Sequence, residues 1–412
     1  MAKARKDNRG RALQKGESQR KEDMRYIYAY TDPFGKRRYI YANDLKTLRE
    51  KEKKLKRNQL DGLNSYAEGN VDLNFVFDRY ISTKTELRRT TYGNYMYLYN
   101  RYVREEFGKR KIGGIRYSDV LYFYFHLTQD RNLRVNTLQT IHSMLHPTFQ
   151  LAVRDEIIRN NPSDGVMAEV KKKLGKNYGV RHALTLEQQR AFMNYTYNRP
   201  EFQRWGPLFT VLLGTGCRIG EVIGLRWKDL DFEQRIIDIN HSVAYYSRGS
   251  LFDKCEYIVS LPKTEAGVRM IPMMDAVYHA FQQEYKWQKE FGFCSAVIDG
   301  MTDFVFTNRL GNIHNPQYIN RTIQRIVESY NSEEILNAEK EKRKPVLIPH
   351  FSCHHFRHTF CTRFCENETN VKVIQSVMGH ANIETTMNVY AEVTEIKKKE
   401  SIEKLSKNMD IF

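Results

Sequence analysis

Two short runs near the N-terminus alternate hydrophobic and polar residues, a pattern that predicts β-strands. These runs are Arg25–Tyr30 and Arg38–Ala42, and the Asp32-Pro33-Phe34-Gly35 segment between them has the composition of a turn. A shorter strand is expected before them, near Glu17–Lys21. The pattern therefore predicts a three-stranded sheet in an N-terminal domain that covers residues 1–68.

Helical periodicity replaces this alternation further along the chain. A charged helix should begin at a cap formed by Asn43 or Asp44 and end at Gly62. From residue 72 onward, apolar residues recur at the three- and four-residue spacing of amphipathic helices. The recurring residues are Leu73, Val76, Phe77 and Tyr80, and further helices are expected around Thr90–Phe107, Tyr117–Thr128 and Asn136–Glu156. These patterns predict an all-helical domain over residues 72–165.

A Lys- and Gly-rich segment, residues 166–182, is expected to be a flexible linker. A third domain, residues 183–412, should begin at a helix capped by Thr185. It contains three strand-like runs, at Arg235–Tyr246, Tyr257–Leu261 and Val268–Pro272, and becomes helical again from Pro316. The predicted fold class is α+β and multidomain, with a mainly helical third domain that carries a small β-sheet.

The charge of the chain points to a polyanionic partner. Its 412 residues include 66 Lys or Arg and 49 Asp or Glu, a net charge of +17. Residues 1–61 hold 19 Lys or Arg against 9 Asp or Glu, a net charge of +10, so the predicted N-terminal sheet could lie in a DNA groove or be a small basic fold. Charge alone leaves DNA, RNA and an anionic membrane open. The absence of a spanning apolar run and of a secretion signal favours a cytoplasmic protein without a membrane partner.

Six cysteines are spread through the chain and are expected to be free thiols. Cys353, Cys361 and Cys365 lie among several histidines, so a zinc site is one interpretation. No Cys-x-x-Cys pair occurs there, which favours the alternative that these cysteines are small buried hydrophobic residues. We expect no metal and no cofactor.

Cleaving a phosphodiester without a metal requires a nucleophile, cations that hold the phosphate oxygens, and an acid for the leaving oxygen. Arg218 follows a Gly-Thr-Gly turn and precedes Glu221 by one helical turn, close enough for the carboxylate to steady the guanidinium. His354 and Arg357 share a helix face at i, i+3. Gly379-His380 and, ten residues later, Tyr390 complete the series.

This ordered set, Arg…His-x-x-Arg…Gly-His…Tyr, resembles the tyrosine recombinase (phage integrase) superfamily. Lys263, in the sequence Pro-Lys-Thr-Glu-Ala-Gly-Val-Arg between two predicted strands, resembles the β-hairpin lysine of that family, and Lys254 is the competing candidate. The helical domain is similar to the family's core-site DNA-binding domain. Asp7–Lys21 and the strands after it resemble the arm-site domain of conjugative-transposon integrases.

The resemblance implies a role for each matched residue. Arg218 and Arg357 would grip the scissile phosphate, and Tyr390 would attack it to leave a 3′-phosphotyrosine. Lys263 would protonate the 5′ oxygen, His354 would assist proton transfer and His380 would bond the phosphate. Glu221 would orient the site. On its own, the Arg218–Glu221 spacing would favour a purely structural ion pair, and His355 and His358 are expected to be structural.

Integration and excision of a mobile element through a Holliday junction are the activity that the resemblance implies. It also implies core and arm sites on double-stranded DNA, a homotetramer on DNA and an accessory excisionase. The tail Ala391–Phe412 has a helical pattern (Ile396, Ile402, Leu405) and would dock on a neighbouring protomer. The alternatives are a type IB-like topoisomerase, for which a separate basic N-terminal domain has no use, and a catalytically silent DNA-binding or architectural protein.

Overall fold

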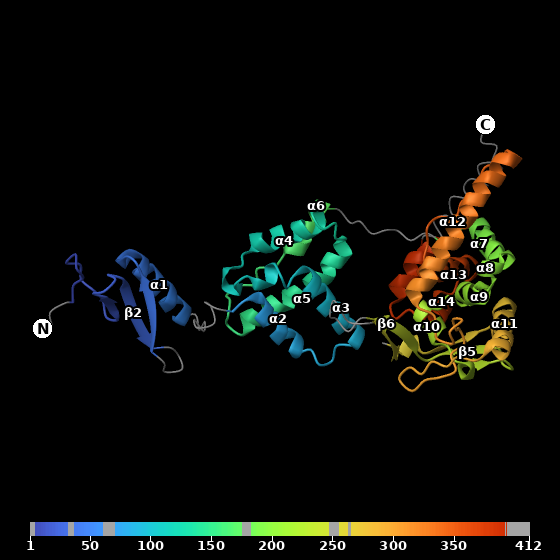
Figure 1. Cartoon of the computed structure of the whole chain (residues 1–412), viewed down its shortest axis with the longest axis horizontal. Coiled ribbons are helices and arrows are strands. Elements are labelled where there is room, and N and C mark those ends of the chain that lie inside the picture. Colours follow the sequence, from blue (N-terminus) through green and yellow to red (C-terminus); the bar gives the residue numbers. More distant parts are fainter. Residues whose placement is uncertain are drawn as a thin grey trace. The chain divides into compact units, whose positions relative to one another are not determined.

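The structure is a computed structural model that describes residues 5–31, 37–60, 71–174, 183–246, 255–262, 265–391 and 393. The described residues form two compact units that divide between residues 174 and 183 (Figure 1). The first unit contains the small N-terminal sheet and a group of helices, and the second contains the residues with candidate chemistry. Each is described by itself.

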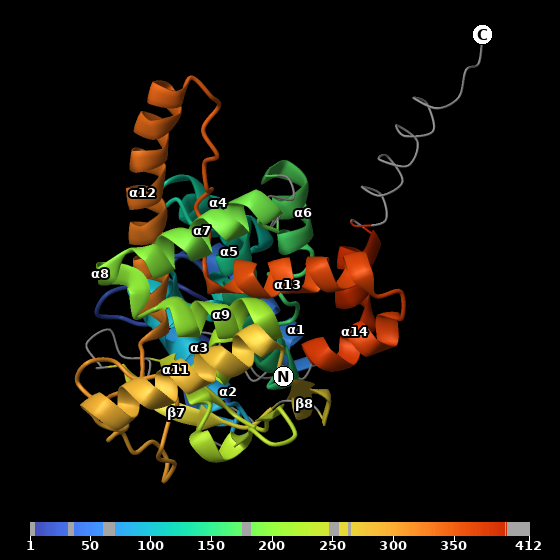
Figure 2. The same cartoon turned by 90° about the vertical axis from the view of Figure 1, so that its right-hand side faces the viewer.

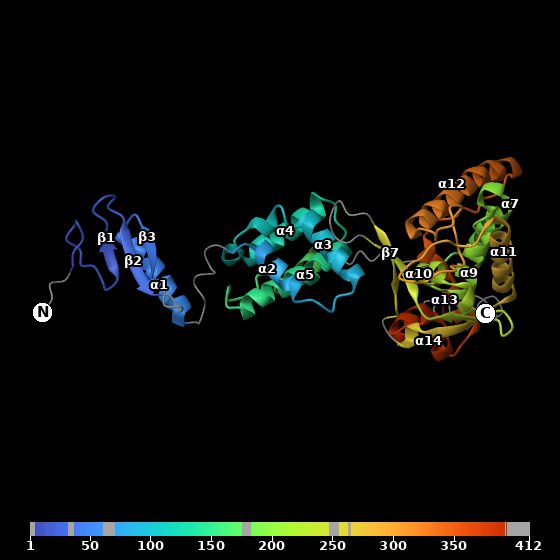
Figure 3. The ribbon, with the colours of Figure 1, turned by 60° about the horizontal axis from the view of Figure 1, so that its bottom comes forward.

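The N-terminal sheet is antiparallel in the order β1-β2-β3, with one helix beside it (Figure 3). Its elements are β1 (Glu17–Gln19), β2 (Tyr26–Thr31), β3 (Arg37–Ala42) and α1 (Leu45–Leu60). The side chain of Asp44 accepts a hydrogen bond from the backbone N–H of Thr47 at 2.8 Å, which confirms the predicted helix cap. Tyr26 and Tyr28 are buried against Leu48 of α1. The expected turn at 32–35 and Gly62 lie outside the described residues.

The helical part of the first unit contains the predicted helices. They are α2 (Leu73–Ser82), α3 (Arg89–Tyr102), α4 (Tyr117–Gln129) and α5 (Val135–Arg154), with 3₁₀ turns η1 (Phe107–Lys109) and η2 (Ile112–Gly114). Their apolar faces meet in one buried cluster, in which the rings of Phe77 and Tyr99 stack with centroids 3.5 Å apart. The periodic apolar residues thus form the core, as the spacing predicts.

The expectation that residues 166–182 form a flexible linker is wrong for the first half of that segment. Residues Val166–Leu174 form helix α6. Val166, Met167 and Val170 are buried in the cluster of the helical domain. Three apolar residues at helical spacing outweigh the lysines, whose charged ends remain at the surface. Residues 175–182 lie outside the described residues.

The described part of the second unit contains eight helices. They are α7 (Leu186–Asn198), α8 (Pro200–Gln203), α9 (Gly206–Thr215), α10 (Ile219–Gly224), α11 (Asp275–Phe291), α12 (Pro316–Glu341), α13 (Cys353–Asn367) and α14 (Val371–Met378). Four of them, α7, α10, α11 and α13, contact α9. Helix α9 lies between α11 and α13 (Figure 2) and is apolar on nearly all sides. The capping box of α7, in which Thr185 and Gln188 bond each other's backbone N–H, has the predicted form.

The strands of this unit form two small sheets rather than one. One sheet has the order β4-β5-β8, and the other pairs β6 with β7. The strands are β4 (Leu230–Asp231), β5 (Ile236–Ile239), β6 (Ser242–Tyr246), β7 (Glu256–Ser260) and β8 (Arg269–Pro272), with 3₁₀ turns η3 (Trp227–Asp229) and η4 (Glu265–Gly267). The strand-like run 235–246 is divided at Asn240 and His241, where the His241 ring lies 2.7 Å from the carbonyl of Gly224.

The sheet order also corrects the hairpin expected around residue 263. β7 pairs with β6, whereas β8 pairs with β5, so the connection from β7 to β8 joins two sheets. The cysteines agree with expectation: all six are free, and Cys353, Cys361 and Cys365 are buried in apolar clusters. None of the helices described is both long and apolar enough to cross a membrane.

Candidate active site

A sharp turn between α9 and α10 places Arg218. Helix α9 ends at Gly216, whose φ of 62° is in the left-handed region that favours glycine. A Cβ on Gly216 would lie 2.3 Å from the ring of Phe360 in α13, so close packing requires glycine there as well. The chain then enters α10 with Arg218 as its N-cap. The glycine turn in the sequence Gly-Thr-Gly-Cys-Arg thus sets the direction in which the chain leaves α9, and with it the position of Arg218 at the start of α10.

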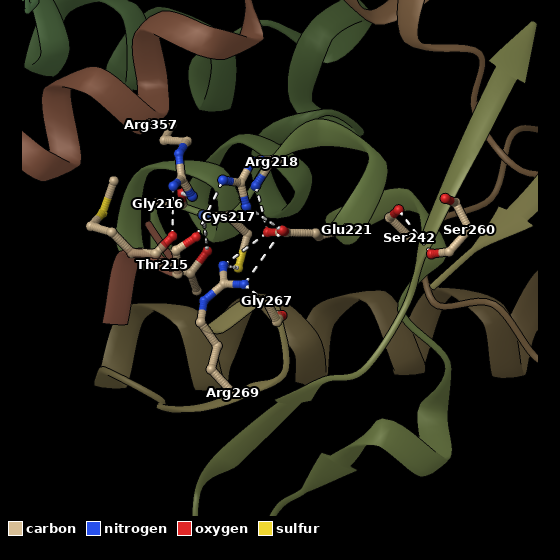
Figure 4. Close-up of polar contacts among 12 residues, drawn as sticks. Thr215, Gly216, Cys217, Arg218, Glu221, Ser242, Ser260, Gly267, Arg269 and Arg357 are labelled. Carbon is tan, nitrogen blue, oxygen red and sulfur yellow. Dashed lines mark hydrogen bonds and ion pairs between the residues drawn. The ribbon is translucent and has the colours of Figure 1, made fainter. Parts of the chain in front are cut away.

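Glu221 is the centre of the charged cluster. Its carboxylate accepts from the backbone N–H of Arg218 at 2.9 Å and from Nη1 of Arg218 at 2.8 Å. On the other side it accepts from Nη2 of Arg269, also at 2.9 Å (Figure 4). The side chain of Arg218 is 43% exposed, whereas those of Glu221 and Arg269 are 8% and 4% exposed. Arg218 can therefore reach a ligand in solution, and Arg269 is enclosed.

The protonation state of Glu221 follows from these contacts. Burial alone raises the pKa of a carboxyl group, but the hydrogen bonds and charges of Arg269 and Arg218 outweigh burial, so the pKa of Glu221 is lowered. Glu221 is consequently ionised at neutral pH. It orients the arginines and is not set up to donate a proton.

Arg357 enters the same cluster from α13. Its Nη1 donates to the carbonyl of Gly216 at 2.8 Å, and its Nη2 donates to the carbonyl of Met378 at 2.5 Å (Figure 4). The side chain is buried. Burial and the nearby charge of Arg218 lower the pKa of Arg357 to about 10, a value at which it is still charged at neutral pH. Arg357 thus joins the end of α9 to the end of α14.

His380 follows the turn that ends α14. Gly379 has a φ of 61°, and its carbonyl accepts from Nη2 of Arg218 at 3.4 Å. The Nδ1 atom of His380 lies 2.8 Å from the hydroxyl of Thr386. Burial first, and then the charges of Arg357, Arg218 and Arg269, lower the pKa of His380 to about 4. The imidazole is therefore neutral at neutral pH.

The site carries an excess of positive charge. Three guanidinium groups, those of Arg218, Arg269 and Arg357, surround the carboxylate of Glu221. Like charges held together are unfavourable unless an anion joins them. A phosphate oxygen at the exposed side of Arg218 would be such an anion.

The remaining predicted residues differ in how far the structure places them. His354 is exposed on the first turn of α13, one turn before Arg357. Tyr390 is half-buried in a helical stretch over 383–391 and packs against the cluster that contains Phe360 and Met378. It thus lies against α13, the helix that carries Arg357, and α14, to whose end Arg357 donates a hydrogen bond. Lys263 and its competitor Lys254 lie outside the described residues. His355 is structural, because its Nδ1 accepts from the backbone N–H of Ser352 at 3.1 Å.

Arg269 belongs to the cluster but was not among the residues predicted from the sequence. Arg269 alternates with its neighbours at β8: Val268, just before the strand, and Met270 are exposed, whereas Arg269 and Ile271 are buried. A charged residue at an inward strand position must have a buried partner of opposite charge. The sequence alone gave no indication that this partner is Glu221.

Family models match both ends of the chain. Residues 182–396 match the phage integrase family, and residues 1–59 match the DNA-binding domain of Tn916 integrase. The chain belongs to the phage integrase family. A transposase from transposon Tn916 of Enterococcus faecalis is 30% identical over 407 residues, which cover 96% of this chain and 95% of that protein. A XerC-like tyrosine recombinase of Caldanaerobacter subterraneus is 24% identical, with 78% of each chain covered.

Solved structures agree with this assignment. The Tn1549 transposon integrase in complex with transposon right-end DNA has a TM-score of 0.67 and 29% identity, and covers 82% of this chain and 100% of that one. A lambda integrase dimer bound to a core site has a TM-score of 0.53 at 14% identity, covering 92% of this chain and 95% of that one, and so shares the fold. This chain is thus a site-specific tyrosine recombinase of the conjugative-transposon integrase type.

Proposed function

We propose that this recombinase integrates and excises a mobile element by cutting DNA with Tyr390 and holding the scissile phosphate with Arg218 and Arg357. The observation that carries the proposal is the three-to-one excess of guanidinium over carboxylate around Glu221, with Arg218 open to solvent. Arginine suits this role because its planar fork donates two parallel hydrogen bonds to phosphate oxygens. The positive cluster would stabilise the additional negative charge of the pentacoordinate phosphorus.

In the cleavage step, the phenolic oxygen of Tyr390 attacks phosphorus and the bond to the 5′ oxygen breaks. The phenolic proton passes to His354, and the leaving oxygen takes a proton from Lys263. His380 is neutral at neutral pH, and its Nδ1 is hydrogen-bonded to Thr386. When Nδ1 is the acceptor, Nε2 carries the proton and can donate a hydrogen bond to a phosphate oxygen. The product is a 3′-phosphotyrosine and a free 5′ hydroxyl. Religation by the 5′ hydroxyl of a second duplex reverses these steps and needs neither ATP nor a metal.

Two DNA-binding regions would give the protein two kinds of site. We assign residues 1–68 to arm sites and residues 72–165 to core sites, with the catalytic domain at 183–412. The net charge of +10 over residues 1–61 and the match to the DNA-binding domain of Tn916 integrase support this division. Deletion of residues 1–68 should abolish binding at distal sites and spare cleavage at core sites. Equal affinity of the truncated protein for both kinds of site would contradict it.

Exchange of strands between two DNA duplexes needs four cleavages. We therefore propose that the protein acts as a homotetramer on DNA. An apolar groove of about 850 Å³ lies beside the site and is lined by Met193, Leu213, Ile271, Phe360 and Val377 among others. We propose that it receives the tail of a second copy, residues 394–412, which carries Ile396, Ile402 and Leu405. Protein truncated before residue 394 should bind but not cleave core DNA. Full-length Tyr390→Phe protein, which supplies tails only, should restore its cleavage. If cleavage is not restored, the proposal that the tail of a second copy occupies the groove is contradicted.

We also propose that excision needs an accessory excisionase that bends DNA between core and arm sites. Purified recombinase should then integrate without this protein and excise only in its presence. Efficient excision by the recombinase alone would contradict the proposal.

The central test is a suicide substrate with a nick beside the cleavage position. The wild-type protein should accumulate a covalent protein–DNA adduct, and Tyr390→Phe should form none because it lacks the hydroxyl. Substitution of an exposed tyrosine elsewhere in the same unit, Tyr318→Phe on α12, provides the control and should form the adduct normally. An adduct of undiminished yield with Tyr390→Phe would exclude Tyr390 as the nucleophile. Strand transfer to a second duplex would then separate recombination from simple relaxation, as a topoisomerase would give only the latter.

A further inference from the structure

We propose that Arg269 is a positioning residue for strand cleavage, one that fixes Glu221 and the turn before His380 relative to each other. This inference rests on the proposed roles of Arg218 and His380. It adds a residue that does not touch DNA and acts through those that do.

The guanidinium of Arg269 joins three separate elements. From β8, its Nη2 donates to Oε2 of Glu221 in α10 at 2.9 Å. Its Nε donates to the carbonyl of Val377 in α14 at 2.8 Å, and its Nη1 reaches the carbonyl of Gly267 at 3.3 Å (Figure 4). These partners lie 48, 108 and 2 residues away along the chain. One side chain therefore sets the separation of the helix start that carries Arg218 and the helix end that carries His380.

Enclosure rules out a direct contact between Arg269 and the phosphate in this arrangement. Its side chain is only 4% exposed, against 43% for Arg218 on the opposite side of the same carboxylate. Both guanidiniums hold Glu221, but only that of Arg218 faces solvent. Arg269 therefore anchors the carboxylate, and the carboxylate orients the group that meets the DNA.

The turn at Gly379 packs directly on Arg269. A Cβ on Gly379 would lie 3.0 Å from Nη1 of Arg269 and 2.9 Å from the carbonyl of Ala266. The carbonyl of Gly379 in turn accepts from Arg218. A displacement of Arg269 would thus move the turn that precedes His380 and one of the hydrogen bonds of Arg218.

Lysine cannot replace this arginine without loss. The ammonium group of lysine is a point charge, whereas the guanidinium donates through Nε and Nη2 in fixed directions to two acceptors on different elements. Lysine would keep the charge opposite Glu221 and lose the tie to Val377. Glutamine would lose the charge as well. The two substitutions therefore separate the electrostatic part of the role from the geometric part.

Electrostatics supply a readout that a purely structural role would not change. The groups that face Glu221 are Arg218 on its own helix, Arg269 on β8, Arg357 on α13, His380 after α14, and the buried thiol of Cys217. Arg269 makes the largest favourable contribution to the ionised carboxylate. Without it, Glu221 should take up a proton at a higher pH and release Arg218.

The experiment is single-turnover cleavage of the suicide substrate as a function of pH by the full-length chain. We expect Arg269→Gln to cleave about 100-fold more slowly than wild type at neutral pH, as displacement of reacting groups by about 1 Å can do. The acid limb of its rate profile should move toward neutral pH. Arg269→Lys should recover part of the rate and the wild-type acid limb. DNA affinity and the melting temperature, measured in parallel, identify variants that fold.

Arg204→Gln is the matched control. Arg204 also pairs with a buried glutamate of the same domain, Glu284, and its partners lie outside the charged cluster. It should lower the melting temperature and leave the cleavage profile of the folded protein unchanged. If Arg269→Gln behaves in the same way, or if Arg269→Lys folds and its acid limb shifts as that of Arg269→Gln does, the positioning role is overturned.

Arg218→Lys in the same assay separates this inference from the proposed function. A severe defect in Arg218→Lys together with a wild-type profile in Arg269→Gln would overturn the positioning role alone. Wild-type cleavage by Arg218→Lys would overturn the phosphate clamp itself. In the double variant Arg269→Gln/Glu221→Gln, the loss should be smaller than the product of the two single losses, because Arg269 acts through Glu221.

Discussion

Two sites in the second unit, each with arginine paired to a buried glutamate, differ in the number of charges that they bring together. At the first, Arg204 pairs with Glu284, whose side chain is wholly buried, and its guanidinium lies 3.8 Å from the ring centre of Trp287. At the second, Glu221 lies between Arg218 and Arg269, and Arg357 approaches from α13. The first site is balanced in charge, and the second is not.

The pKa values of the two glutamates respond in opposite directions. Burial dominates at Glu284, so the pKa of that carboxyl is raised in spite of Arg204. At Glu221 the pair of guanidiniums overcomes burial and lowers the pKa. A nearby buried histidine has a lowered pKa at each site, about 3 for His314 and about 4 for His380. Burial is thus common to both sites, and the surplus of cations distinguishes the second.

The two sites therefore differ in role: the charges of the first stabilise the fold, whereas the surplus positive charge of the second can bind an anionic ligand. In a balanced buried pair the two charges neutralise each other, and removing one of them mainly lowers the free energy of unfolding. A surplus of cations repels itself in the free protein, but its interaction with a bound phosphate is favourable. The cluster around Glu221 therefore has the electrostatics of a phosphate site, although each of its ion pairs taken singly is an ordinary arginine–glutamate pair.

The largest expected effect is on cleavage by Arg218→Lys. A point charge replaces a bidentate donor, so the cleavage rate should fall about 100- to 1000-fold while DNA affinity changes little. Single-turnover cleavage and a binding titration measure the two quantities. Arg204→Lys is the control and should retain the wild-type rate. Unimpaired cleavage by Arg218→Lys would count against the clamp.

A smaller effect is expected when each carboxylate is neutralised. Glu221→Gln leaves the guanidiniums of Arg218, Arg269 and Arg357 without their counter-charge and should lower the free energy of unfolding by about 3 kcal/mol. Glu284→Gln should cost less, because the raised pKa of Glu284 means that its neutral form is already better tolerated. Urea unfolding of both variants at pH 7 compares them. A larger loss of stability in Glu284→Gln than in Glu221→Gln would contradict the difference between the two sites.

The smallest expected effect concerns the two histidines. Both have a lowered pKa when folded, so the unfolded chain binds protons first as the pH falls below about 6.5. Their contribution to stability is complete above that pH and is lost progressively as the pH falls, down to about pH 4 for His380 and about pH 3 for His314. Inorganic phosphate bound at the cluster should offset the arginines and raise the pKa of His380, but not that of His314.

A titration of the imidazole resonances by nuclear magnetic resonance, with phosphate and chloride at equal ionic strength, measures this difference. Burial remains the larger cause at His380, so its pKa should rise only part of the way to 6.5. An equal rise at both histidines would indicate a general salt effect. No rise at His380 would mean that phosphate does not bind beside it.

Local pattern sufficed for much of the fold. Alternation in β2 and β3, the periodic apolar residues of α2 and the caps at Asp44 and Thr185 depend on neighbours within a few residues, and each was predictable. The pattern failed where distant contacts compete with it. Residues 166–174 look like a charged linker, yet Val166, Met167 and Val170 gain burial against other helices and make the segment helical.

The candidate site divides in the same way. The sequence by itself predicted which residues carry the chemistry, because Arg218, Arg357, His380 and Tyr390 stand in the order of the motif that resembles the phage integrase family. It also determined the turns at Gly216 and Gly379, since positive φ values there favour glycine. Only the tertiary structure decided that Glu221 has two arginine partners, that Arg269 joins β8 to α10 and α14, and that the two halves of the run 235–246 enter different sheets. The physical reason is that a buried charge is stabilised by whichever opposite charge and hydrogen-bond partners packing brings near it, and sequence spacing does not specify contacts across 48 or 108 residues.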